Sequence, residues 1–298
     1  MDKLLLFTMF NTRQYFLYTI YGIMVTVIFI YVLFPSETVK AYLIQGLNRS
    51  NPDLSMTIDR IKPVFPPGIK LSAIDLYRSG KSLMDVGQIT IRPKYLSLFG
   101  ENQSANFTGD VYGGNFKGTA VLLTREPEPV RPMEINADFS GIQIEQIPFF
   151  ETVFKRKISG RLQGKVLYKG KELAGTLTGN IILADSTIAL PTSVFNLDHL
   201  TFESIEADLA FQSQMLQVKN CTLTGQQVKG SFSGFIRINT PFKESGINLS
   251  GTFKPQPSFI PALTQNIPKG LLPKTVLSEN GFTIRLRGTF AEPGYTVR

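Results

Sequence analysis

From about residue 55 to the end of the chain, apolar and polar residues alternate with a period of two. Clear examples are the runs Ile135 to Phe139, Ile205 to Phe211, Ile247 to Phe253 and Phe282 to Phe290. A period of two puts the apolar side chains of a β-strand on one face and the polar side chains on the other. The body of the protein is therefore predicted to be built mainly of strands.

The N-terminal part has a different pattern. No charged residue occurs from Gln14 to Ser36, and the apolar run 15–34 is as long as the roughly 20 residues that a membrane-spanning helix needs. No small-residue cleavage site follows the run, so we predict an uncleaved single-pass anchor. Lys3 and Arg13 precede the anchor and Glu37 follows it, which predicts a cytoplasmic N-terminus (1–14) and an extracytoplasmic body.

After the anchor, residues 35–54 are predicted to form an amphipathic helix and a linker. Val39, Leu43 and Leu47 recur at helical spacing, so the helix either lies on the outer leaflet or docks on the sheet. The strands divide into a first β segment (55–125) and a second (133–298), separated by the acidic, proline-bearing linker 126–132. Short helices are expected at 148–155 and 258–265.

A short glycine pattern recurs within the β segments. Gly-x-apolar-x-Gly units pair Gly114 with Gly118, Gly160 with Gly164, Gly175 with Gly179, and Gly230 with Gly234. Because side chains alternate along a strand, we expect all eight glycines on the apolar face. The predicted fold is a curved, repeat-built antiparallel sheet, an open sandwich or a trough. Two interpretations of the glycines remain open: they accept neighbouring side chains in a packed sheet, or they line an apolar trough for an acyl chain.

Composition and charge exclude several kinds of site. The 31 basic and 23 acidic residues give a net charge of +8, but the charges are scattered, which is typical of a solvated surface or one facing anionic headgroups and not of nucleic-acid binding. A single cysteine, Cys221, cannot form an intrachain disulfide, and with a single histidine, His199, it provides no imidazole or thiolate metal cluster.

Motifs for catalysis are missing from the sequence as well. It contains no nucleophile motif, phosphate loop or dinucleotide fingerprint. Carboxylates such as Glu203, Glu206 and Asp208 occupy polar positions of strands, so a carboxylate-pair enzyme is the least favoured alternative. We expect no catalytic residues, no cofactor and no metal.

The order of these features carries a family resemblance. An anchor, an amphipathic helix, the segment Pro67 to Leu76, the segment Leu83 to Leu98, a glycine ladder, the segment Ile142 to Phe150 and a closing Arg285 to Pro293 follow one another. In this order the chain resembles the AsmA-like group, and most closely the delta-proteobacterial form of type II secretion system protein N (GspN).

The resemblance implies a protein anchored in the bacterial inner membrane with a periplasmic body. It implies an accessory component of a type II protein secretion system that acts by contact with other secretion subunits and has no catalytic residues. The alternative within the same group is a lipid-binding or phospholipid-transport protein with an apolar trough.

Overall fold

The structure is a computed structural model of the chain. It describes residues 2–50, 52–78, 80–123, 132–148, 150, 157–171, 174–194, 197–239, 241–257 and 281–297. Except for Pro132, Pro148 and Phe150, the predicted linker at 126–132 and the short helices predicted at 148–155 and 258–265 lie outside these residues.

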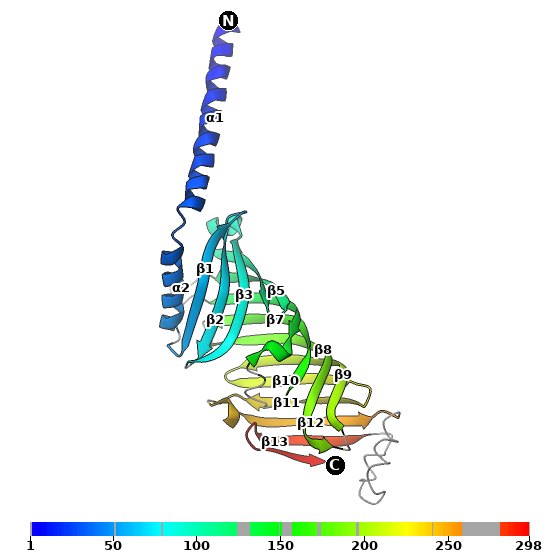
Figure 1. The fold of residues 1–298 in the computed structure, drawn as a ribbon. Coiled ribbons are helices and arrows are strands. Elements are labelled where there is room, and N and C mark those ends of the chain that lie inside the picture. The colour runs from blue at the N-terminus through cyan, green and yellow to red at the C-terminus, as the bar shows by residue number, and fades with distance from the viewer. Residues whose placement is uncertain are drawn as a thin grey trace, which may run out of the picture.

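The first helix, α1 (Asp2–Val32), projects from one end of the body as a single rod (Figure 1). Its stretch Gln14–Val32 is long and apolar enough to cross a membrane, and none of it is buried against other parts of the protein. Thr19 donates its hydroxyl hydrogen bond to the carbonyl of Tyr15 at 2.9 Å, which satisfies this donor without water, as a bilayer interior requires. The described part of the chain thus carries one N-terminal helix suited to single-pass anchoring.

The body confirms the predicted mainly β fold, because its described residues form one open antiparallel sheet of 14 strands. The strands are β1 (Leu54–Val64), β2 (Gly68–Arg78), β3 (Lys81–Pro93), β4 (Asn102–Val111), β5 (Gly114–Leu123), β6 (Met133–Gln143), β7 (Ile158–Lys171), β8 (Ala174–Val194), β9 (Leu197–Gln212), β10 (Met215–Thr224), β11 (Val228–Arg237), β12 (Gly246–Pro255), β13 (Phe282–Thr289) and β14 (Pro293–Val297). Within the residues that the structure describes, three short 3₁₀ helices connect strands: η1 (Tyr95–Phe99), η2 (Ile144–Gln146) and η3 (Phe242–Glu244).

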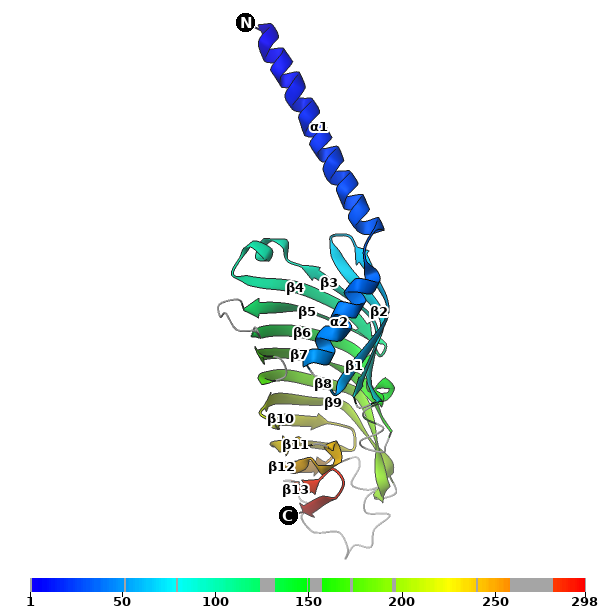
Figure 2. The same cartoon turned by 90° about the vertical axis from the view of Figure 1, so that its left-hand side faces the viewer.

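Each strand pairs only with its neighbours in the sequence, so the sheet is a meander without crossover connections. Because β5 pairs with β6, the two predicted β segments contribute to the same sheet. The strands stack away from α1, and β14 lies at the far end (Figures 1 and 2). At the usual strand spacing of roughly 4.8 Å, the 14 strands measure roughly 60 Å along the curved sheet.

The sheet is folded over instead of flat. β1–β3 stand at a steep angle to the strands that follow, and the outer halves of β8 and β9 run down in front of β10–β12 (Figure 1). Bulges account for the bends: Ala73 in β2 and Asp185 in β8 have φ of 49°, Gly141 in β6 has φ of 70°, and the β6–β7 register shifts beside Gly141. Bulges bend a strand and increase its twist. The result is a strongly curved open sheet, and we call its concave side the trough.

Buried side chains gather in two clusters on the inside of this trough. The first lies at the α1 end and contains Ile58, Ile61, Leu71, Ile74, Val86, Val111 and Ile142. The second contains Phe202, Val218, Cys221 and Leu223, packed against half-buried side chains of β8–β12 such as Ile188 and Leu249. The second cluster therefore joins the outer part of the β8–β9 hairpin to β10–β12.

The second helix, α2 (Ser36–Ser50), docks on the sheet beside β1 (Figure 2). Val39 and Leu43 pack against the first cluster, while Tyr42 is 77% exposed. Of the two positions predicted for this helix, docking is the one observed. The apolar stripe of α2 thus covers part of the trough at its α1 end.

Candidate functional site

One face of the sheet is apolar along nearly its whole length. Residues paired directly across neighbouring strands lie on the same face, so the pairing register shows which side chains line up across the sheet. Three successive lines of paired residues, which we name rows A, B and C, cross the sheet without a charged residue or an amide side chain. Because pairing runs perpendicular to the strands, the rows extend from the α1 end toward the C-terminal end.

The rows are built as follows. Row A is Ile69, Ile91, Phe107, Gly118, Ala137, Val166, Gly179, Leu209, Val218, Gly234, Leu249 and Leu286. Row B is Leu71, Ile89, Gly109, Phe116, Phe139, Gly164, Ile181, Ala207, Cys221, Phe232, Gly251 and Ile284. Row C is Ala105, Ala120, Ile135, Tyr168, Leu177, Phe211, Leu216, Ile236, Ile247 and Gly288. Together we call them the apolar face.

Most of the apolar face is only half-buried. From Ala105 to Ile247, every residue of row C is in this intermediate state, and Leu286 at the end of row A is 36% exposed. A closed protein interior is packed as densely as an organic crystal, and its central side chains are fully buried. The two buried clusters cover only parts of the apolar face, so the remainder is accessible from the open side of the trough.

Four of the eight predicted glycines belong to rows A and B, and three others lie on the same side of the sheet, paired with residues next to these rows. Gly118, Gly179 and Gly234 lie in row A and Gly164 lies in row B. The other partners are Val111 for Gly114, Gly170 for Gly175, and both Leu223 and Phe253 for Gly230. Gly160 lies in the register shift between β7 and β8 with φ of 146°.

Aromatic rings from neighbouring strands fill several of the glycine notches. A Cβ atom on Gly118 would lie 2.5 Å from Cζ of Phe107, and one on Gly175 would lie 2.6 Å from Cε2 of Tyr168. The same holds at 3.1 Å for Gly230 and the ring of Phe253. Rings laid over strand glycines stabilise a curved sheet. In these notches the glycines therefore accept neighbouring side chains, which is the first of the two interpretations of the glycine pattern. The concave shape of the trough comes from the folding of the sheet and not from the glycines.

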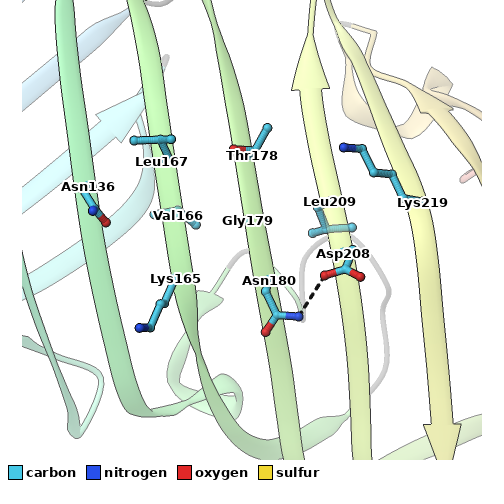
Figure 3. A pocket seen from close by; sticks show the side chains of 10 residues that line it. All are labelled: Asn136, Lys165, Val166, Leu167, Thr178, Gly179, Asn180, Asp208, Leu209 and Lys219. Atoms are coloured by element: carbon cyan, nitrogen blue, oxygen red, sulfur yellow. Dashed lines mark hydrogen bonds between the residues drawn. The ribbon is translucent and has the colours of Figure 1, made fainter.

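The opposite face of the sheet is polar and carries cross-strand pairs. Lys165 Nζ lies 3.7 Å from Asp138 Oδ1, and Asn180 donates a hydrogen bond to Asp208 at 2.9 Å. A shallow hollow of about 500 Å³ lies here around Gly179, and Lys165, Asn180 and Asp208 line up across it (Figure 3). Exposed ion pairs of this kind contribute little to stability, about 0–1 kcal/mol each. Their polar and charged side chains instead keep this face of the sheet hydrated.

Toward the C-terminal end, the polar face becomes basic. We name as the basic face six side chains of β10–β13 that form no ion pair or hydrogen bond within the described part of the chain: Lys219, Lys229, Arg237, Lys254, Arg285 and Arg287. Lys229 and Lys254 pair directly, which places like charges side by side. Arg237, Arg287 and the exposed ring of Phe235 line a hollow of about 360 Å³.

The next question is whether Cys221, His199 or the carboxylates of the described residues are placed for catalysis or metal binding. Cys221 is buried, and burial raises the pKa of its thiol to about 11, so the thiol stays protonated near neutral pH. His199 is exposed on β9 opposite Ala189. Among the residues that the structure describes, no group of three His, Cys, Asp or Glu is placed to hold a metal ion. The hollow at Gly179 is lined by one carboxylate, Asp208, whereas carboxylate-pair hydrolysis needs two.

Comparison of the chain with protein-family models, with curated proteins and with solved structures finds no match.

Proposed function

We propose that this chain is a single-pass protein of the bacterial inner membrane that binds phospholipid acyl chains along its apolar face and performs no catalysis. The observation that carries the proposal is the run of rows A, B and C across the sheet, mostly half-buried and without a charged side chain. Covering such a surface with an acyl chain gains about 25 cal/mol for each Å² of apolar area removed from water.

The apolar and polar faces of the sheet suit a protein that carries an acyl chain. An acyl chain needs a continuous apolar surface, and the protein around it needs a polar outer surface to stay in water. The rows begin near α1 and lead away from it, so the apolar face connects the membrane end of the body with its far end. Lys3 and Arg13 before the anchor and Glu37 after it support a periplasmic body.

Two matched double variants test the proposal. Val166→Glu with Leu209→Glu puts carboxylates on the apolar face, on either side of Gly179 in row A. Leu167→Glu with Ala210→Glu makes the same changes one residue along each strand, on the polar face on either side of Thr178. Phospholipid that copurifies with the full-length protein is then quantified by mass spectrometry.

We expect the apolar-face variant to carry several-fold less phospholipid than the parent, because a carboxylate is costly beside an acyl chain. The polar-face variant should carry as much as the parent. Lipid that surrounds α1 is common to all three proteins, so the difference reports the apolar face. Equal lipid content in all three would contradict the proposal.

A second candidate function is the accessory role in type II protein secretion, by contact with other secretion subunits. The basic face favours it, because unpaired arginines around an exposed aromatic ring are typical of protein interfaces. The sequence resemblance to GspN points the same way.

The test of this candidate is copurification with identified secretion subunits. Arg237→Glu with Arg287→Glu reverses two charges of the basic face and should abolish both copurification and secretion, whereas Lys165→Glu on the polar face near Gly179 should leave both unchanged. Secretion at the parent level in the arginine variant would remove this candidate.

A further inference from the structure

Two turns of the body lie beside the end of α1. Tyr31, in the last turn of α1, donates a hydrogen bond to the carbonyl of Val64 at 2.7 Å. Tyr95 of η1 donates one to the carbonyl of Pro67 at 2.6 Å. The β1–β2 turn (65–67) and η1 are thus joined to each other and to α1, and we call these two turns the tip.

The tip exposes large apolar side chains. Phe99 and Leu96 of η1 are 92% and 91% exposed, and Phe65 of the β1–β2 turn is 78% exposed. On the strands of the described body, exposed large apolar residues reach only about 40%, as at Met84. A cluster of exposed apolar side chains marks a surface that another apolar phase covers.

The position of α1 identifies that phase. The apolar stretch of α1 ends at Val32, so Tyr31 lies at the boundary between hydrocarbon and water if α1 spans a bilayer. The hydrogen bond from Tyr31 holds Val64 at the same level, and Phe65 is the next residue. Lys62 and Lys94 are exposed next to the two turns, where anionic headgroups would attract them.

We propose that Phe65, Leu96 and Phe99 insert into the leaflet on the side where α1 leaves the membrane. The body is then attached at the tip as well as through α1, and its orientation to the membrane is fixed. Ile69 and Ile91, which begin row A, lie on the strands that lead away from the tip. The tip is therefore where an acyl chain passes between leaflet and apolar face, a consequence that rests on the function proposed above.

Fluorescence quenching in the full-length protein tests the insertion. The chain, with Cys221→Ala, is reconstituted into vesicles of phosphatidylethanolamine and phosphatidylglycerol that carry brominated acyl chains. An environment-sensitive fluorophore is attached at Leu96→Cys or, as the matched control, at Gln226→Cys, an exposed turn between β10 and β11. We expect several-fold stronger quenching by brominated lipid at position 96 than at position 226.

Equal, weak quenching at the two positions would overturn the insertion. A second variant guards against misplacement of the probe: Leu96→Asp with Phe99→Asp should abolish the quenching of a fluorophore at Phe65→Cys while α1 keeps the protein in the vesicles. Unchanged quenching there would also contradict the proposal. The two proposals can fail separately. Strong quenching at the tip, together with equal copurified phospholipid in the apolar-face and polar-face variants, would support insertion and contradict lipid binding on the apolar face. Weak quenching at the tip, together with less phospholipid in the apolar-face variant, would contradict insertion and support lipid binding.

Discussion

At the scale of single residues, glycine and aromatic side chains together shape the apolar face. Gly164 pairs with Phe139 and Ile181, and a Cβ atom on it would lie 3.1 Å from the ring of Phe139. The same Cβ would also press on the carbonyl oxygen of Asn180, a backbone atom that has little room to move. The glycine is therefore needed for strand contact whether or not an acyl chain lies over it.

Gly164→Ala should destabilise the protein by roughly 1–3 kcal/mol, because the added methyl group overpacks against backbone. Gly246→Ala is the matched control, since Gly246 also lies in a strand and a Cβ atom on it would meet no atom within 4 Å. It should leave stability within about 0.5 kcal/mol. Thermal unfolding of the full-length variants in detergent measures both. Equal stability of the two variants would contradict the packing described for Gly164.

Cys221 should be almost inert. Burial raises its pKa from 9.0 to about 11, so near neutral pH the reactive thiolate is about a hundredfold rarer than for an ordinary cysteine. Folded protein should therefore react with a maleimide far more slowly than protein unfolded in denaturant. Above about pH 9 the unfolded state gains thiolate first, so the contribution of Cys221 to stability should be lost as the pH rises through this range. Rapid labelling of the folded protein would contradict this burial.

At the scale of elements, α2 is the link between anchor and sheet. Its stripe of Val39 and Leu43 packs on the first buried cluster, where the sheet turns over. The helix follows the anchor after a short turn, so docking also fixes where α1 leaves the body. Loosening α2 should free both helices from the sheet.

Leu43→Ala should speed the hydrogen exchange of the α2 amides, because the half-buried side chain supplies part of the contact that holds the helix. A destabilisation of about 1–2 kcal/mol is expected, below the range for a fully buried leucine. Tyr42→Ala, on the exposed side of the same helix, should leave the exchange unchanged. Similar exchange in the two variants would mean that α2 is not held by this contact.

The elements differ in how far the sequence predicts them. Alternation identifies the strands and their apolar side chains, as in Ile205 to Phe211, because it depends only on strand geometry. It does not reveal the bulges at Ala73 and Asp185, since positive φ at non-glycine residues leaves no composition signal. These bends and long-range packing set the steep angle of β1–β3 and place the outer halves of β8 and β9 in front of β10–β12. They also determine the position of the tip. Phe65 and Phe99 therefore stand out only once their exposure is known.

At the scale of the whole molecule, an anchor stands at one end of a long two-faced sheet. The apolar face runs away from the α1 end, and the basic face lies on the other side of the sheet near the far end. Nine strand spacings of roughly 4.8 Å, about 43 Å along the sheet, separate β1 from β10, where the basic face begins, and this is several times a Debye length of about 10 Å. The two ends thus differ in chemistry: exposed apolar side chains at the tip, and unpaired cationic side chains at the basic face.

The proposed orientation in the membrane, with the N-terminus in the cytoplasm and the body in the periplasm, can be tested by cysteine labelling. With Cys221→Ala and Gln226→Cys, a membrane-impermeant maleimide applied to intact spheroplasts should label the protein, because Gln226 is exposed and the body is proposed to be periplasmic. A cysteine at Asp2 should react only after lysis. The opposite result would put the body in the cytoplasm.

Photo-crosslinking in the membrane measures whether acyl chains lie on rows A, B and C, as we propose. Full-length protein is expressed in cells fed a fatty acid with a photoreactive group in its acyl chain, irradiated in the membrane and digested, and the lipid adducts are mapped to residues. We expect adducts at alternate residues of neighbouring strands, at Val166 and Tyr168 of β7 and at Leu177 and Leu209 of β8 and β9, with none at Lys165 or Asn180 on the polar face. Adducts confined to α1 and the tip, with none on these strands, would contradict it.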